Sequence, residues 1–131
     1  MARDLTRDEG SAVVDFALVG ALLTLLFVSV VQVALVVHVR NTLVDCASEG
    51  ARWGARAGRT PDDGADRTRD LVAAELSAGY AARLADVTAD QVDRGGVQVV
   101  KVVVRAPLPL IGLLGPTSAL RVSGHAFDER Q

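Results

Sequence analysis

The sequence predicts an α+β protein in which a long N-terminal transmembrane helix leads to a small domain, with one helix packed on a short antiparallel β-sheet. Three observations predict this fold class: an uncharged apolar run at 16–37, a helical apolar stripe near the middle of the chain, and two β-branched runs near its end. At 131 residues the chain has room for one such domain.

The apolar run is long enough to cross a bilayer. At about 1.5 Å per residue, a helix over 16–37 measures roughly 33 Å, against a hydrocarbon core of about 30 Å. A buried helix that is apolar all round would need protein on every side, and the rest of the chain is too short and too polar to supply it. A signal peptide is a poorer fit, because the run exceeds about 15 residues and no A-x-A site follows. We therefore expect a retained membrane anchor over 11–39.

Residues 40–57 are expected to continue this helix as an amphipathic extension. Gly50, Gly54 and Gly58 recur every four residues, and small residues at that spacing let two helix backbones approach closely. The alternative is that the glycines fray the helix toward Gly58, because glycine weakens a helix by about 1 kcal/mol relative to alanine. Glu49 and Arg52 are spaced to form an ion pair.

The small domain, 58–131, is predicted to begin with a turn-rich loop at 60–66 and a helix over 67–85. This helix carries one apolar stripe at a spacing of four: Val72, Leu76, Tyr80 and Leu84. The segment 90–96 breaks the pattern.

Two strands are predicted to follow, at 97–105 and 120–127. In the first, Val100, Val102 and Val104 face one way while Lys101 and Arg105 face the other. In the second, two sets of side chains alternate: Leu120, Val122 and Ala126 against Arg121, Ser123 and His125.

The segment 107–116 between these strands is an apolar loop rich in proline and glycine around Ile111. Two interpretations stay open. The loop folds back on the core, or it is a contact surface for a partner or for the bilayer.

The composition and motifs exclude several functions. With 14 Lys and Arg against 16 Asp and Glu, and only 4% aromatic residues, we expect no nucleic-acid partner. The single cysteine, Cys46, excludes an internal disulfide and a cysteine-rich metal cluster. His38 and His125 lie far apart, and the sequence has neither a phosphate-binding glycine loop nor a nucleophile elbow. We therefore expect no enzyme activity, no catalytic residue, no metal and no cofactor.

The start of the chain carries the most informative motif. A short charged segment, 1–10, ends in Gly10 and is followed by Ser11, small or apolar residues, Asp15 and Phe16. This order resembles type IV prepilins and, more closely, the TadE-like pseudopilins of tight-adherence (Flp-type) pilus systems. The resemblance implies that 1–10 is a leader that a prepilin peptidase removes between Gly10 and Ser11. Asp15, the fifth mature residue, replaces the usual Glu with the same charge and a shorter reach.

The likeness continues after the span, where residues 48–55 resemble the E-G-A-R stretch of TadE-like proteins at Glu49, Gly50, Ala51 and Arg52. The resemblance implies a type IV pilin-like architecture and a minor pilin-like subunit or assembly component of a tight-adherence pilus or related secretion apparatus. Its implied partners are the membrane, other pilin and pseudopilin subunits and the assembly platform. The Gly50, Gly54 and Gly58 strip and the loop around Ile111 are the candidate partner surfaces.

Two interpretations of Asp15 are considered. As an interface acid it favours the start of a helix through the helix dipole. In the interpretation that the resemblance favours, it also neutralises the Ser11 amine of a neighbouring subunit and sets the register of the two helices. The alternative function is an uncleaved single-pass membrane anchor that carries an extracytoplasmic binding module.

We expect the N-terminus in the cytoplasm and the domain outside the bacterial cytoplasmic membrane, either held there or incorporated in a surface pilus. Counting arginines near the span favours the opposite orientation, since Arg3 and Arg7 precede it while more follow. The rule applies best to short loops, and the segment after residue 39 is a whole translocated domain.

Overall fold

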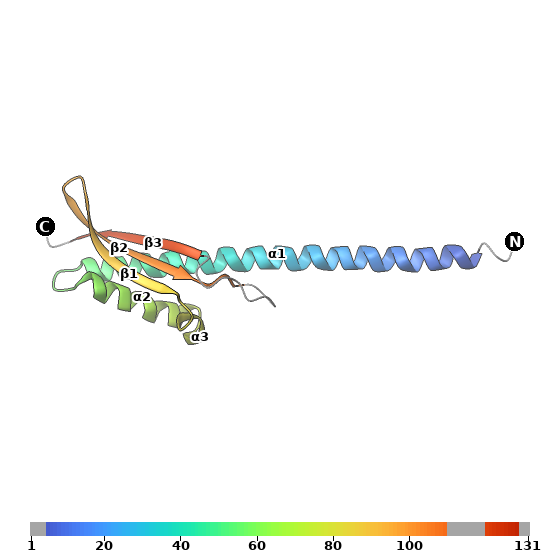
Figure 1. Cartoon of the computed structure of the whole chain (residues 1–131), viewed down its shortest axis with the longest axis horizontal. Helices are drawn as coiled ribbons and strands as arrows, with labels where there is room; N and C mark the ends of the chain where they lie inside the picture. Colours follow the sequence, from blue (N-terminus) through green and yellow to red (C-terminus); the bar gives the residue numbers. More distant parts are fainter. Residues whose placement is uncertain (1–4, 110–119, 129–131) are drawn as a thin grey trace. The chain divides into compact units, whose positions relative to one another are not determined.

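The computed structural model describes residues 5–109 and 120–128, and within them it confirms the predicted α+β fold (Figure 1). The chain divides into two compact units, one up to Ala34 and the other from Leu35 onward. The elements, in chain order, are α1 (Leu5–Ala55), α2 (Pro61–Glu75), α3 (Ala78–Ala81), β1 (Asp86–Arg94), β2 (Val97–Ala106) and β3 (Leu120–Phe127).

In the described residues the first unit is the part of α1 up to Ala34, and its large apolar side chains are exposed. Phe16 is 81% exposed and Leu22 is 66% exposed. The helix is long and apolar enough to cross a membrane. The polar side chains in this stretch are satisfied locally, because the Thr24 hydroxyl donates to the Gly20 carbonyl at 2.8 Å and the Ser29 hydroxyl donates to the Leu25 carbonyl at 2.7 Å.

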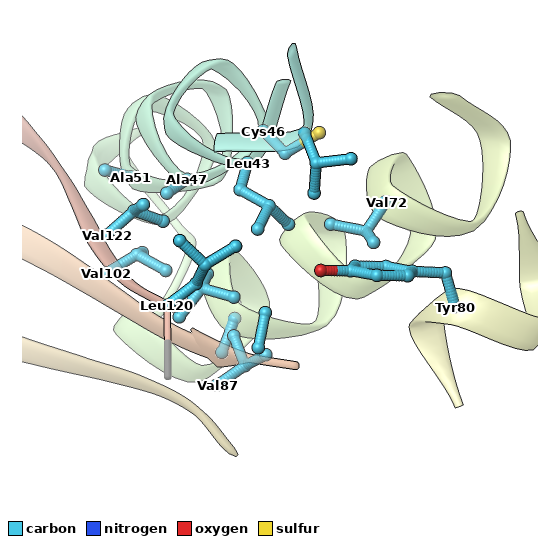
Figure 2. Close-up of a cluster of buried hydrophobic side chains, with 14 of the residues drawn as sticks. Leu43, Cys46, Ala47, Ala51, Val72, Tyr80, Val87, Val102, Leu120 and Val122 are labelled. Atoms are coloured by element: carbon cyan, nitrogen blue, oxygen red, sulfur yellow. The ribbon is translucent and has the colours of Figure 1, made fainter. Parts of the chain in front are cut away.

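The second unit is an antiparallel sheet, ordered β1-β2-β3 in the described residues, with helices packed on it. The predicted faces of the strands are confirmed: Val100, Val102 and Val104 are fully buried, whereas Arg105 and Arg121 are exposed. The core also contains side chains from the last turns of α1 and from α2, including Leu43, Ala47, Ala51 and Val72 (Figure 2).

Strand β1 was not expected, and its absence from the prediction has a physical reason. Its sequence contains three aspartates, a residue that strands disfavour, and it forms an edge of the sheet where such residues are tolerated. Gly95 and Gly96 both have positive φ, 68° and 88°, and they form the two-residue turn that joins β1 to β2. The segment 90–96 is therefore a hairpin rather than a break.

The predicted helix over 67–85 was wrong at both ends. The segment 60–66 contains the start of α2, because Thr60 and Asp63 form a capping box and Pro61 occupies the first turn. The helix ends at Glu75, and Ser77 caps the short helix α3. Val72 and Tyr80 are nevertheless both buried. The loop around Ile111 lies outside the described residues.

Candidate assembly site

The residues at the predicted processing site lie in the exposed part of α1. Gly10, Ser11, Asp15 and Phe16 are all helical and exposed. A side chain added at Gly10 would meet nothing within 4 Å. Nothing in the described part of the chain covers this stretch, so it is accessible to lipid, to another helix or to a processing enzyme.

Gly50 and Gly54 pack against another helix of the same chain. A Cβ added at Gly50 would lie 2.6 Å from the Gly64 carbonyl oxygen and would overlap the Thr68 side chain, and one added at Gly54 would lie 3.0 Å from the Thr60 carbonyl oxygen. The close helix approach that the spacing predicted therefore occurs between α1 and α2. Gly50 and Gly54 are buried and cannot serve as a surface for a partner subunit.

Gly58 has a different role from the other two glycines of the strip. Helix α1 ends at Ala55, and Gly58 has a φ of 81°, the left-handed conformation that glycine adopts without strain. No atom lies within 4 Å of a Cβ built there. Gly58 thus helps the chain leave α1 and enter α2, and it makes no helix contact.

A neighbouring side of α1 is approached equally closely by β3. A Cβ on Gly124 would overlap the backbone of Ala47 and Ser48, so the strand lies directly on the helix. Ala47, Ala51 and Ala55 are also buried, which explains the strip of alanines along this part of α1. Small residues here allow the helix to fit between α2 and the sheet.

The stretch from Glu49 to Arg52 divides into buried and exposed positions. Gly50 and Ala51 pack inward, whereas Glu49 and Arg52 form the predicted ion pair at 3.4 Å on the surface. Exposed pairs of this kind contribute less than about 1 kcal/mol to stability. The motif is therefore explained mainly by the packing of its two small residues.

Trp53, directly after this stretch, carries three guanidinium groups on its ring. The distances from the ring centroid to the Arg59, Arg56 and Arg67 carbons are 4.5, 5.0 and 5.5 Å. Such contacts are each worth about 0.5–1 kcal/mol at exposed sites. They tie the end of α1 to the start of α2.

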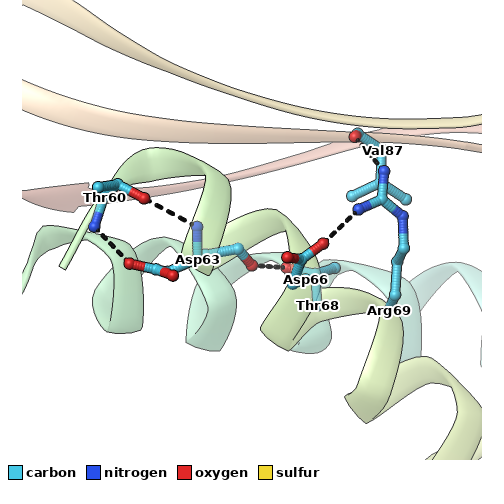
Figure 3. Close-up of polar contacts among 7 residues, drawn as sticks. Thr60, Asp63, Asp66, Thr68, Arg69 and Val87 are labelled. Carbon is cyan, nitrogen blue, oxygen red and sulfur yellow. Dashed lines mark hydrogen bonds and ion pairs between the residues drawn. The ribbon is translucent and has the colours of Figure 1, made fainter.

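Polar contacts fix α2 against α1 and β1 (Figure 3). The Thr68 hydroxyl donates to the Gly64 carbonyl at 2.8 Å and lies 3.5 Å from the Cys46 carbonyl oxygen. The Arg69 guanidinium donates to Asp66 at 2.8 Å and to the Val87 carbonyl at 2.9 Å. The Asp63 carboxylate accepts from the Thr60 backbone N–H at 2.8 Å, and the backbone and side chain of Thr60 hold the pKa of Asp63 below its usual value.

Sequence reasoning missed the partners of the glycine strip. Gly64 and Gly124 stand singly in the sequence, so no spacing indicated that they would meet α1. Thr68, which is fully buried beside Gly50 and Gly64, also gave no signal. In the part of the chain that the structure describes, no three His, Cys, Asp or Glu side chains gather as a metal site.

Comparison with known proteins gives one result. Residues 10–52 match the family model described as TadE-like protein. The match begins at Gly10, extends through the apolar part of α1 and ends at Arg52, the last residue of the E-G-A-R stretch. No curated protein and no solved structure matches the chain.

Proposed function

We propose that this chain, whose residues 10–52 match the TadE-like family model, acts as a minor pilin-like subunit or assembly component of a tight-adherence pilus or a related secretion apparatus. It is anchored by the apolar part of α1 and acts by association of that helix with the helices of other pilin or pseudopilin subunits. The exposed apolar surface of α1 is the observation that carries this proposal.

Several features of α1 support a helix that lies in lipid beside other helices. Its large side chains are exposed in the absence of a membrane, and the hydroxyls of Thr24 and Ser29 bond to the helix's own carbonyls. Hydroxyl groups that bond within their own helix are suited to the hydrocarbon core. In this proposal the first ten residues stay in the cytoplasm and the packed domain lies outside.

Processing of the leader is the next step of the proposal. A prepilin peptidase cleaves between Gly10 and Ser11, and the new Ser11 amine carries a positive charge at the start of the apolar helix. Asp15 of a neighbouring copy or pilin neutralises that charge. Because a charge near the bilayer is costly unless it is paired, the pairing favours a single register between the two helices.

Mass spectrometry of the membrane-extracted protein, from a host with an active prepilin peptidase, tests the processing. We expect a chain that begins at Ser11, and Gly10→Ala should leave residues 1–10 attached while the protein still reaches the membrane. Gly20→Ala is the matched control, because both glycines are exposed on α1 with nothing within 4 Å. A native chain that keeps residues 1–10 contradicts the proposal and favours the uncleaved anchor.

Substitution of Asp15 tests the pairing. Asp15→Ala should reduce co-purification with pilus components by about tenfold or more, since an unpaired amine is left near the membrane, whereas membrane insertion stays unchanged. Asp45→Ala, at an exposed acid farther along α1, is the control. Equal co-purification of wild type and Asp15→Ala would remove the pairing role.

A further inference from the structure

The packed domain carries opposite charges along the two edges of its sheet. Strands β1 and β3 flank β2 and form the edges of the described sheet. One groove lies between α2 and β1, and we call it the acidic groove; another lies between α1 and β3, and we call it the basic groove. Both belong to the unit that begins at Leu35.

The acidic groove has a volume of about 380 Å³. Its carboxylates come from Asp62 and Asp66 on α2 and from Asp90 on β1. Arg69 is the guanidinium of the groove, and it is already bound to Asp66 and to the Val87 carbonyl. The remaining lining is mostly small and apolar, from Ala65, Val87, Thr88 and Ala89.

The basic groove has a volume of about 460 Å³ and is lined by Arg52, Arg56, His125, Ala126 and Phe127. Glu49 offsets part of the charge of Arg52. Arg94, the last residue of β1, adds a positive charge near the basic groove, because its Nη2 atom lies 3.5 Å from the His125 Nε2 atom. Phe127 is 75% exposed, which is unusual for an aromatic side chain at the end of a strand.

His125 lies near two further cations of the sheet, Arg94 and Lys101. Partial burial lowers its pKa below the ordinary value of 6.5, and the nearby charges of Arg94 and Lys101 lower it further. Protonation of His125 is thus opposed by surrounding cations. A carboxylate placed in the groove would relieve that repulsion.

We propose that the acidic groove of one copy of this chain packs against the basic groove of a second copy, with Phe127 seated beside Thr88 and Ala89 of the acidic groove. The contact is electrostatic, and its exposed aromatic supplies an anchor of the kind that dominates protein interfaces. This inference rests on the proposed function, since a shared membrane raises the effective concentration of copies.

The geometry determines the type of assembly. The two grooves lie at different edges of one sheet, so a contact between them is heterologous and leaves one free groove at each end of a pair. Copies would therefore add in a row. Addition of a strand to β1 is a weaker alternative, because Arg69 already occupies the Val87 carbonyl on that edge.

Charge reversal in the full chain tests the contact. One variant carries Arg52→Glu and Arg56→Glu, and the other carries Asp62→Arg and Asp90→Arg. Two differently tagged copies are reconstituted in liposomes and one tag is captured at low salt. Each variant should co-purify with itself about tenfold less than wild type does, because like charges then face each other. A mixture of the two variants should recover wild-type capture, since an unaltered acidic groove then meets an unaltered basic groove.

Matched controls carry the same change of charge elsewhere on the domain. Arg105→Glu with Arg121→Glu alters the outer face of the sheet, and Asp45→Arg with Glu75→Arg alters the groove beside Cys46. Circular dichroism checks that every variant is folded. If the Arg52→Glu and Arg56→Glu variant is not, Arg52→Gln with Arg56→Gln takes its place. The proposal is overturned if the groove variants are captured as well as wild type is, or if capture does not recover in the mixture of the two variants. It is also overturned if the control variants lose as much capture as the groove variants do. The identity of the N-terminal residue is measured independently, so failure of this contact leaves the proposed function intact.

Discussion

The two halves of α1 differ in whether the rest of the chain covers their apolar residues. Up to Ala34 the helix carries large side chains such as Phe16 and Leu22, and they are exposed. Farther along, Ala47 and Ala51 are fully buried by elements of the same chain. Hydrophobicity alone therefore does not determine burial within this protein. Small residues in the second half let α2 and β3 approach the helix closely, whereas no element of the described chain covers the first half.

The largest difference in stability is expected between two glycine substitutions, one where β3 contacts the covered half of α1 and one in the exposed half. Gly124→Val should destabilise the packed domain by more than about 3 kcal/mol, because the new side chain would overlap the backbone of α1 at Ala47 and Ser48. Gly20→Val, where a Cβ meets nothing within 4 Å, should leave the stability of the domain unchanged. Urea unfolding in detergent, followed by Trp53 fluorescence, measures both. Equal stability of the two variants would mean that β3 does not lie on α1.

Truncating leucine in each half gives the next largest effect. Leu43 is fully buried, and Leu43→Ala should cost about 3 kcal/mol through lost contacts and a residual cavity. Leu22 is 66% exposed, and Leu22→Ala should not change the unfolding of the domain. The same urea titration compares them. A large loss for Leu22→Ala would show that the first unit contributes to the core.

The smallest expected effect concerns the charges of the packed half. His125 should titrate below 6.5, and Arg94→Gln should raise its pKa, because a neighbouring cation is removed. Since the folded-state pKa is the lower one, the unfolded chain binds more protons, and stability should fall slightly as pH drops below about 6.5. NMR titration of the imidazole signals measures the pKa. An unshifted value in wild type would contradict the effect of burial and of the neighbouring cations on His125.

Periodic segments of the fold were predictable, and segments that depend on distant contacts were not. The apolar run of α1 and the alternating valines of β2 carry their structure in their own spacing. Strand β1 is polar and depends on pairing with β2, so its residues alone do not predict a strand. The sequence of 60–66 does contain a capping box, which was interpreted as a loop because its turn residues serve both structures.

The candidate site was likewise predictable where spacing indicated it, and not where it depended on distant residues. The spacing of Gly50 and Gly54 indicated a close helix approach, and the folded chain places both residues against α2. It could not identify the partner, because Gly64 gives no periodic signal and a partner subunit would satisfy the same spacing. The basic groove joins Arg52 and Arg56 to His125 and Phe127 from the last strand, and only the folded chain brings them together.

The packing of Gly124 on α1 constrains the order in which the domain folds. Strand β3 covers the helix that precedes it by most of the chain, and this long-range contact can form only after residues 120–127 have become available. Until then the side of α1 at Ala47 and Ser48 lacks the strand that covers it. The domain is therefore completed only when β3 pairs with β2 and packs on α1.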